Sequence, residues 1–209
     1  IDGFRLDAIR YLIEEDGLAG QADSPKTLAF WQDFSEHVKN INPKAVLIGE
    51  ALTDTPKVAE YYQAGKGIHQ AFDFGFNYNV KSFLGTKERE DLLQRIPNTI
   101  ELENRIRDTL WQRLARFHDQ EQKSLADKKV PSHFFASFLN NHDTDRLETF
   151  FDNAINPSKI AAALLTFTPG PIYFYYGEEI GIGQAATGDD MFRRGLMQWD
   201  DSANAGFSQ

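Results

Sequence analysis

Three carboxylates close short segments that have the length and composition of β-strands. Asp7 closes GFRLD, Glu50 closes AVLIGE and Asp143 closes FLNNHD. A parallel α/β barrel carries its catalytic groups at the carboxyl ends of its strands. The positions of these acids therefore predict one site to which separate strands each contribute a carboxylate.

Asp7 and Glu50 are the candidate pair for cleaving a glycosidic bond. Cleavage with retention of configuration needs two carboxyl groups about 5–5.5 Å apart, one to attack the anomeric carbon and one to protonate the leaving oxygen. Neighbouring parallel strands lie about 4.8 Å apart, so acids at the ends of two such strands reach one ligand. We assign Asp7 as the nucleophile. Glu50 follows an apolar run, where partial desolvation suits it to be the acid and then the base.

Two polar side chains stand beside these acids. Arg5 precedes Asp7 by two residues, so the alternation of a strand places both on one face, with a guanidinium beside the carboxylate. Asp143 is expected to bind sugar hydroxyls and to stabilise an oxocarbenium-like transition state. His142, directly before it, is a candidate donor to a hydroxyl group.

Each motif alone also has a structural interpretation, and for a single motif that interpretation is the more common one. An Arg-x-Asp pair on a strand is usually an ion pair. A strand-end Glu is often a helix cap, and Asn-His-Asp is often a cluster of loop hydrogen bonds. Three such motifs, each after a strand, favour a catalytic site.

Apolar strand-like runs alternate with helical patterns along the chain. Strands are predicted at 1–6, 45–49, 70–74, 134–139 and 171–176. The alternation indicates a parallel sheet, and acids at the strand ends favour an α/β fold of the TIM (β/α)8 type over a nucleotide-binding sheet. A complete barrel has eight strands and about 250 residues, so the chain is predicted to hold a partial barrel of about strands 4 to 8.

Four helices are predicted between the strands. The first has Ser24 as its N-cap and Pro25 at its first position. Its predicted buried face consists of Leu28, Trp31, Phe34, Val38 and Ile41. A second runs from Thr55 to about Tyr62, with Gly65 to end it. The third covers 102–117 and precedes a polar segment at 118–131, and the fourth is capped by Asn156-Pro157 and carries Ile160, Leu164 and Phe167.

Composition narrows the classes of partner. The 209 residues carry a net charge of -9 without a block of Lys or Arg, which argues against nucleic acid and against anionic membrane surfaces. No apolar run reaches the roughly 20 residues of a membrane span. Cysteine is absent, which excludes disulfides and thiolate metal sites. Localisation, either bacterial cytoplasmic or secreted to the periplasm or beyond, and oligomeric state stay undetermined.

The motifs together resemble glycoside hydrolase family 13, the α-amylase family. GFRLDA resembles its fourth-strand motif, VLIGE its fifth, FLNNHD its seventh, and GPIY with YGEE its eighth. The resemblance implies that Asp7 is the nucleophile, Glu50 the acid/base and Asp143 the transition-state stabiliser, with Arg5 and His142 contacting substrate. It also implies a single partial catalytic barrel over 1–209, without the first three strands, the inserted domain or the C-terminal β-sandwich.

Two details of the resemblance indicate a subgroup. RGLMQWD, from Arg194, resembles a segment of α-glucosidases, oligo-1,6-glucosidases, trehalose synthases and related bacterial amylases. Arg146 resembles a substrate-binding arginine of that group, the alternative being a surface ion pair with Asp145 or Glu148. Many members carry Lys-His after the nucleophile, where the His carbonyl binds a structural calcium. Arg10-Tyr11 here puts that site in doubt, although calcium in a longer parent protein stays open, and the chemistry itself requires no cofactor.

The expected activity is retaining hydrolysis of α-glucosidic bonds in α-glucans or maltooligosaccharides. Transglycosylation or isomerisation, as in trehalose synthase, is the alternative within the family. A non-catalytic relative that serves as an interaction module is the alternative of another class. Because five strands leave open sheet edges, the 209 residues expressed alone are expected to aggregate or to be inactive.

Overall fold

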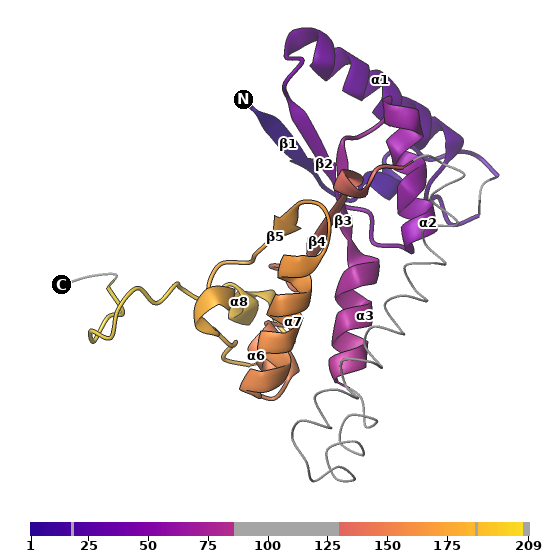
Figure 1. Ribbon diagram of the computed structural model, residues 1–209. Coiled ribbons are helices and arrows are strands. Elements are labelled where there is room, and N and C mark those ends of the chain that lie inside the picture. Colours follow the sequence, from indigo (N-terminus) through magenta and orange to yellow (C-terminus); the bar gives the residue numbers. More distant parts are fainter. Residues whose placement is uncertain (18, 86–129, 187, 207–209) are drawn as a thin grey trace. The chain divides into compact units, whose positions relative to one another are not determined.

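The computed structural model describes residues 1–17, 19–85, 130–186 and 188–206 (Figure 1). Its strands form one sheet in chain order: β1 (Gly3–Leu6), β2 (Val46–Gly49), β3 (Gln70–Asp73), β4 (Phe135–Phe138) and β5 (Ile172–Tyr173). The pairs from β1 to β4 are parallel. The five predicted strands are therefore present, although the last is only two residues long instead of 171–176.

Glycines allow close packing at both ends of the β1–β2 pair. A Cβ atom on Gly3 would lie 2.2 Å from the carbonyl oxygen of Val46. A Cβ atom on Gly49 would lie 2.5 Å from Cδ1 of Ile68 and 2.6 Å from Cδ1 of Ile9. Because real Cβ atoms do not approach so closely, a larger residue at either position would displace its neighbours.

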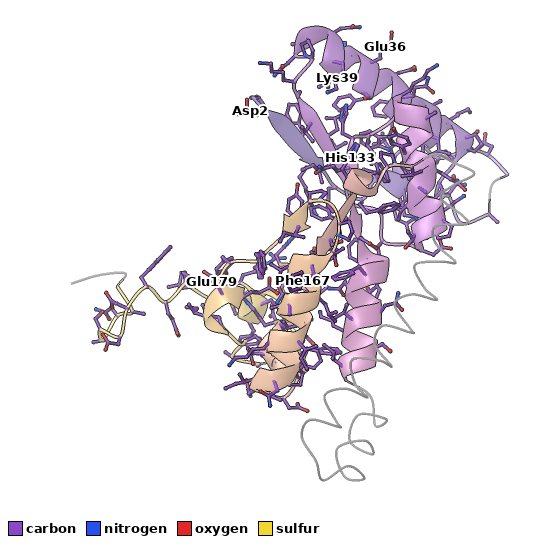
Figure 2. All side chains as sticks on the ribbon, viewed as in Figure 1. Asp2, Glu36, Lys39, His133, Phe167 and Glu179 are labelled. Carbon is purple, nitrogen blue, oxygen red and sulfur yellow. The ribbon has the colours of Figure 1, made fainter. Side chains whose placement is uncertain are left out.

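Helix α1 (Pro25–Ile41) begins as the sequence predicts. The Oγ of Ser24 accepts a hydrogen bond from the backbone of Thr27 over 3.0 Å, which is the N-cap contact. At the other end, Nζ of Lys39, labelled in Figure 2, donates to the carbonyls of Pro43 and Ala45 over 2.9 and 2.8 Å. The predicted face is wrong at Ile41, which is exposed, because the helix ends there and has left the core.

The second predicted helix is broken into two pieces. Helix α2 (Thr55–Val58) continues as the 3₁₀ segment η2 (Ala59–Gly65). Gln63 and Ala64 adopt left-handed backbone angles, with φ of 49° and 54°, and these end the helical path just before Gly65. The glycine therefore marks the end of the element, as predicted.

Three further helices are α3 (Phe74–Leu84), α6 (Leu147–Phe150) and α7 (Ile155–Phe167). Phe74 was expected to end a strand but begins α3, a helix that the sequence pattern did not predict. Helix α7 has Ala154 as its N-cap, so the predicted cap at Asn156 is wrong. Its buried positions are led by Ala161 and Leu165, while Phe167, labelled in Figure 2, is exposed.

The remaining short helices lie in loops: η1 (Ile9–Tyr11), η3 (Ser132–Phe134), η4 (Glu178–Ile180) and α8 (Asp190–Arg193). The predicted helix at 102–117 and most of the polar segment at 118–131 fall outside the described residues. Within the described ranges, no helix combines the length and hydropathy of a membrane span.

The described chain divides into two compact units, each with its own core. Unit 1 contains 1–17, 19–75, 130–137 and 169–171, and unit 2 contains 76–85, 138–168, 172–186 and 188–206. The core of unit 1 centres on Trp31, Leu47 and Tyr61. The core of unit 2 centres on Leu84, Leu139 and Leu165. A single partial barrel domain over 1–209 stays a prediction.

Candidate active site

Asp7 and Glu50 directly follow paired strand ends in unit 1. The register of β1 and β2 pairs Leu6 with Gly49, so the two acids occupy the next position of the ladder. Backbone bonds continue the pairing, because Glu50 N donates to Leu6 O over 2.9 Å and Ile9 N donates to Glu50 O over 3.1 Å. The parallel register therefore sets both acids side by side.

The guanidinium of Arg5 joins the two acids. Its Nη1 lies 2.8 Å from Oδ1 of Asp7, and its Nη2 contacts Oε2 of Glu50. The contact with Asp7 follows from the strand alternation, and the contact with Glu50 follows from the register. The two carboxylates are thus close enough to share one cation.

The two acids differ in their surroundings. The side chain of Asp7 is 76% exposed, whereas that of Glu50 is 17% exposed. Asp7 is therefore open to an approaching ligand, while Glu50 is largely enclosed by protein. This asymmetry suits one group that attacks a ligand and another that exchanges a proton with it.

Asp143 lies in the loop after β4, within unit 2. Its Oδ1 accepts a hydrogen bond from Nη2 of Arg194 over 3.0 Å, and its Oδ2 lies 3.1 Å from Nε2 of His142. The Nε of Arg194 also donates to the carbonyl of His142 over 3.2 Å. One arginine therefore holds two successive residues that the sequence assigns to substrate contact.

Asp145, two residues after Asp143, is held by side chains in a similar way. Its Oδ1 accepts hydrogen bonds from Nε2 of Gln184 and from Nε of Arg193, each over 3.0 Å. The bond from Gln184, supported by that from Arg193, lowers the pKa of Asp145. Arg193 and Arg194 thus bind alternate acids of one loop and connect α8 to it.

Arg146 is completely buried in unit 2. Its Nε donates to the carbonyl of Arg193 over 2.9 Å, and its Nη1 donates to the carbonyl of Tyr176. The guanidinium carbon lies 4.3 and 4.5 Å from the ring centroids of Tyr175 and Tyr176. Among the described residues its Nη2 has no hydrogen-bond partner. Arg146 is therefore no surface residue, and its contact with substrate stays a prediction.

A buried lysine, Lys81, and a half-buried glutamate, Glu178, also lie in unit 2. Burial lowers the pKa of Lys81 to about 8, and burial raises the pKa of Glu178 to about 7. Oε2 of Glu178 accepts a hydrogen bond from Tyr175 N over 3.0 Å. Its Oε1 is buried without a hydrogen-bond partner in the described part of the chain. Both groups are therefore held in unfavourable surroundings for their charged forms.

Arg10 and Tyr11 stand where many members of the family that the sequence resembles carry the Lys-His pair of a calcium site. The guanidinium of Arg10 binds the carboxylate of Asp23, so this carboxylate already has a cationic partner. In the described ranges no group of three or more His, Asp or Glu side chains is arranged to hold a metal ion.

The structure brings together Arg5, Asp7 and Glu50 in one unit, and His142 with Asp143 in the other. Sequence reasoning quoted Arg194 only as part of a motif and missed its contact with Asp143. The two residues are 51 positions apart, and neither periodicity nor strand pattern connects them. The position of RGLMQWD after the last predicted strand was the only available signal.

Comparison with known proteins supplies the family. Residues 1–209 match the family described as alpha amylase, catalytic domain. Alpha-amylase 3 of Dictyoglomus thermophilum is 28% identical over 201 residues, which are 96% of this chain and 33% of that protein. The trehalose synthase/amylase TreS of Mycobacterium tuberculosis is 30% identical over 220 residues, with 100% of this chain and 36% of that protein covered. The chain thus spans about a third of the length of these relatives.

Solved structures give the same fold. The alpha-amylase from H. orenii superposes with a TM-score of 0.67 at 22% identity, over 97% of this chain and 35% of that one. Amy13B of Eubacterium rectale superposes with a TM-score of 0.69 at 24% identity, over 97% of this chain and 34% of that one. The parallel five-stranded sheet is therefore part of a TIM barrel, and the chain belongs to the α-amylase family by the match of its whole length to that family's catalytic domain.

Proposed function

We propose that the protein that contains this chain hydrolyses α-glucosidic bonds in α-glucans or maltooligosaccharides with retention of configuration. The observation that carries the proposal is the contact of one guanidinium, that of Arg5, with both Asp7 and Glu50. A retaining glycosidase requires two carboxyl groups this near to each other. The names of the relatives support the substrate class.

The proposed reaction has two steps. Asp7 attacks the anomeric carbon while Glu50 gives a proton to the glycosidic oxygen, which leaves with the aglycone. Glu50 then removes a proton from water, whose oxygen attacks the anomeric carbon and releases Asp7. Arg5 binds Asp7 and orients it for the attack. Asp143, assisted by His142, binds sugar hydroxyls and stabilises the positive charge of the transition state, and Arg146 contributes to substrate binding.

Replacement of the nucleophile tests this assignment. In the intact protein, Asp7→Asn is expected to lower kcat on maltooligosaccharides and on an aryl α-glucoside by about 10⁴-fold or more, because an amide does not form the glycosyl ester. Asp2→Asn is the matched control, since Asp2 is an exposed carboxylate at the start of the same segment (Figure 2). Undiminished hydrolysis by the Asp7 variant would refute the proposal.

Interconversion of maltose and trehalose is the second candidate. It is favoured by the relatives described as trehalose synthases, which match the whole length of this chain. Incubation with maltose separates the two activities, because hydrolysis gives glucose alone and isomerisation gives trehalose. Turnover of an α-glucosyl fluoride, which needs no acid for its leaving group, separates either enzyme from a non-catalytic interaction module.

A further inference from the structure

The side chain of Arg10 connects four segments of unit 1. Its Nε and Nη2 donate to the carboxylate of Asp23 over 3.0 and 2.7 Å, and its Nη1 donates to the carbonyl of Leu52 over 2.6 Å. The hydroxyl of Tyr61 donates to Oδ1 of Asp23 over 2.6 Å. The guanidinium therefore joins η1, the residue before the cap of α1, the loop after β2, and η2.

This cluster is largely removed from water. The side chain of Asp23 is 4% exposed, and Tyr61 is completely buried. Burial alone would raise the pKa of Asp23, but the hydrogen bonds from Arg10 and Tyr61 outweigh it and lower that pKa. The hydrogen bond with Asp23 in turn raises the pKa of Arg10. The pair is therefore charged, and both oxygens of Asp23 are engaged by protein donors.

Two residues of the cluster follow the proposed catalytic acids closely in the sequence. Arg10 is three residues after Asp7, and Leu52 is two residues after Glu50. Backbone bonds tie the same segments, since Asp23 N donates to Arg10 O over 2.8 Å. An ion that bridged these loops would have to replace the guanidinium, because Arg10 already fills the space between Asp23 and the carbonyl of Leu52.

We propose that Arg10 fixes the loops after β1 and β2 through its contacts with Asp23 and Leu52, so that its guanidinium holds the carboxylate of Asp23 and no divalent metal ion binds there. Arg10 thereby acts as a positioning residue for Asp7 and Glu50. The planar guanidinium suits this task, because its fork binds a carboxylate with two parallel bonds and still has donors for a carbonyl. The positioning part rests on the function proposed above, whereas the metal part does not.

The test measures thermal unfolding of the intact protein in EDTA and in CaCl₂. Arg10→Met and Asp23→Asn are each expected to lower Tm by at least about 5 °C, because each leaves a buried partner of a charge pair alone. Arg10→Lys is expected to recover little of this loss, since an ammonium does not reproduce the fork. Lys26→Met is the matched control, because Lys26 is exposed and its ion pair with Glu15 is 3.9 Å long, and it should change Tm by less than about 2 °C.

Calcium provides the decisive comparison. We expect the difference in Tm between EDTA and CaCl₂ to be the same in the original protein and in Asp23→Asn, whatever its size. A stabilisation by calcium that Asp23→Asn abolishes would overturn the proposal, as would an Arg10→Met variant no less stable than Lys26→Met. These readouts do not depend on catalysis, so they stand even if Asp7→Asn shows that the proposed function is wrong.

Kinetics test the positioning part. Well below the Tm of every variant, Arg10→Met is expected to lower kcat roughly tenfold to hundredfold with little change in KM, because small displacements of catalytic groups slow the chemical steps. Arg10→Lys should recover less than half of the kcat that Arg10→Met loses. An unchanged kcat beside a lowered Tm would show that Arg10 only stabilises the fold and would overturn its positioning role.

Discussion

The acids of unit 1 and the acid of unit 2 are held by different means. Asp7 and Glu50 owe their proximity to the register of two neighbouring strands, and Arg5, which lies on one of these strands, contacts both. Asp143 follows a single strand and is held by Arg194 from a distant segment. Backbone pairing places Asp7 and Glu50, whereas side-chain contacts hold Asp143. We therefore expect different sensitivities to substitution in the two places.

The largest effect is expected where two acids depend on one side chain. Arg5→Met should lower kcat about 10²-fold to 10³-fold, because Asp7 and Glu50 lose their shared cation and repel each other.

Arg5→Lys is the control that keeps the positive charge but removes the forked geometry of the guanidinium. It should recover part of the activity, since an ammonium satisfies one acid but does not bridge both as well. Equal activity of the methionine variant and the original protein would show that strand register alone orients the pair.

A smaller effect is expected in unit 2. Arg194→Met should lower kcat about tenfold, because Asp143 keeps its contact with His142 but loses the arginine that orients it. Tm should change little, because the Arg194–Asp143 pair is exposed. Asp190→Asn removes the other carboxylate that Arg194 binds and serves as the matched control. A loss of Tm as large as the loss of activity would show that the contact is structural.

Glu178 and Lys81 of unit 2 predict a pH dependence of stability. Glu178 has a pKa of about 7 in the folded chain against 4.5 for an exposed glutamate, so the folded chain retains a proton that the unfolded chain releases between these values. Stability from this group is therefore complete below about pH 4.5 and is lost as pH rises towards 7. Lys81 acts in the opposite direction, and its contribution should rise with pH from about 8 to 10.5.

Thermal unfolding across pH 4.5 to 7 measures the effect of Glu178. Glu178→Gln should flatten the decline of Tm over this range, because the amide does not ionise. Glu179→Gln, which changes the exposed neighbour labelled in Figure 2, should leave the slope nearly unchanged. Identical slopes in the two variants would contradict the assignment.

The smallest effect concerns the backbone beside the nucleophile. Ala8 has left-handed angles, with φ of 43° and ψ of 45°, which an alanine adopts at a cost. Ala8→Gly should raise the free energy of unfolding by about 0.5–1 kcal/mol, measured by denaturant titration. Ala29→Gly in the interior of α1 should lower it by a similar amount, because glycine there loses more freedom on folding. A destabilising Ala8→Gly would indicate that Ala8 packs through its methyl group.

What the sequence predicts well is what local pattern determines. The strand ends that carry Asp7 and Glu50, and the cap at Ser24, follow from alternation, apolar runs and side-chain chemistry. Helix α3 did not follow, because its sequence FGFNYNVKSFL begins with a glycine and aromatic residues that favour other structures. Contacts between distant segments, such as Arg194 with Asp143 or Arg10 with Leu52, have no local pattern. They arise only when tertiary packing brings the segments together.

Gly49 has a consequence for how relatives of this chain are interpreted. A Cβ atom there would displace the buried side chains of Ile9 and Ile68, so packing favours the glycine whether or not a reaction takes place. The next residue, Glu50, is required by the proposed reaction, and a glutamine has the same size. A relative that keeps the glycine but has lost the acid would therefore retain the architecture without the activity. Position 49 thus reports the packing at the end of β2, and position 50 reports the chemistry.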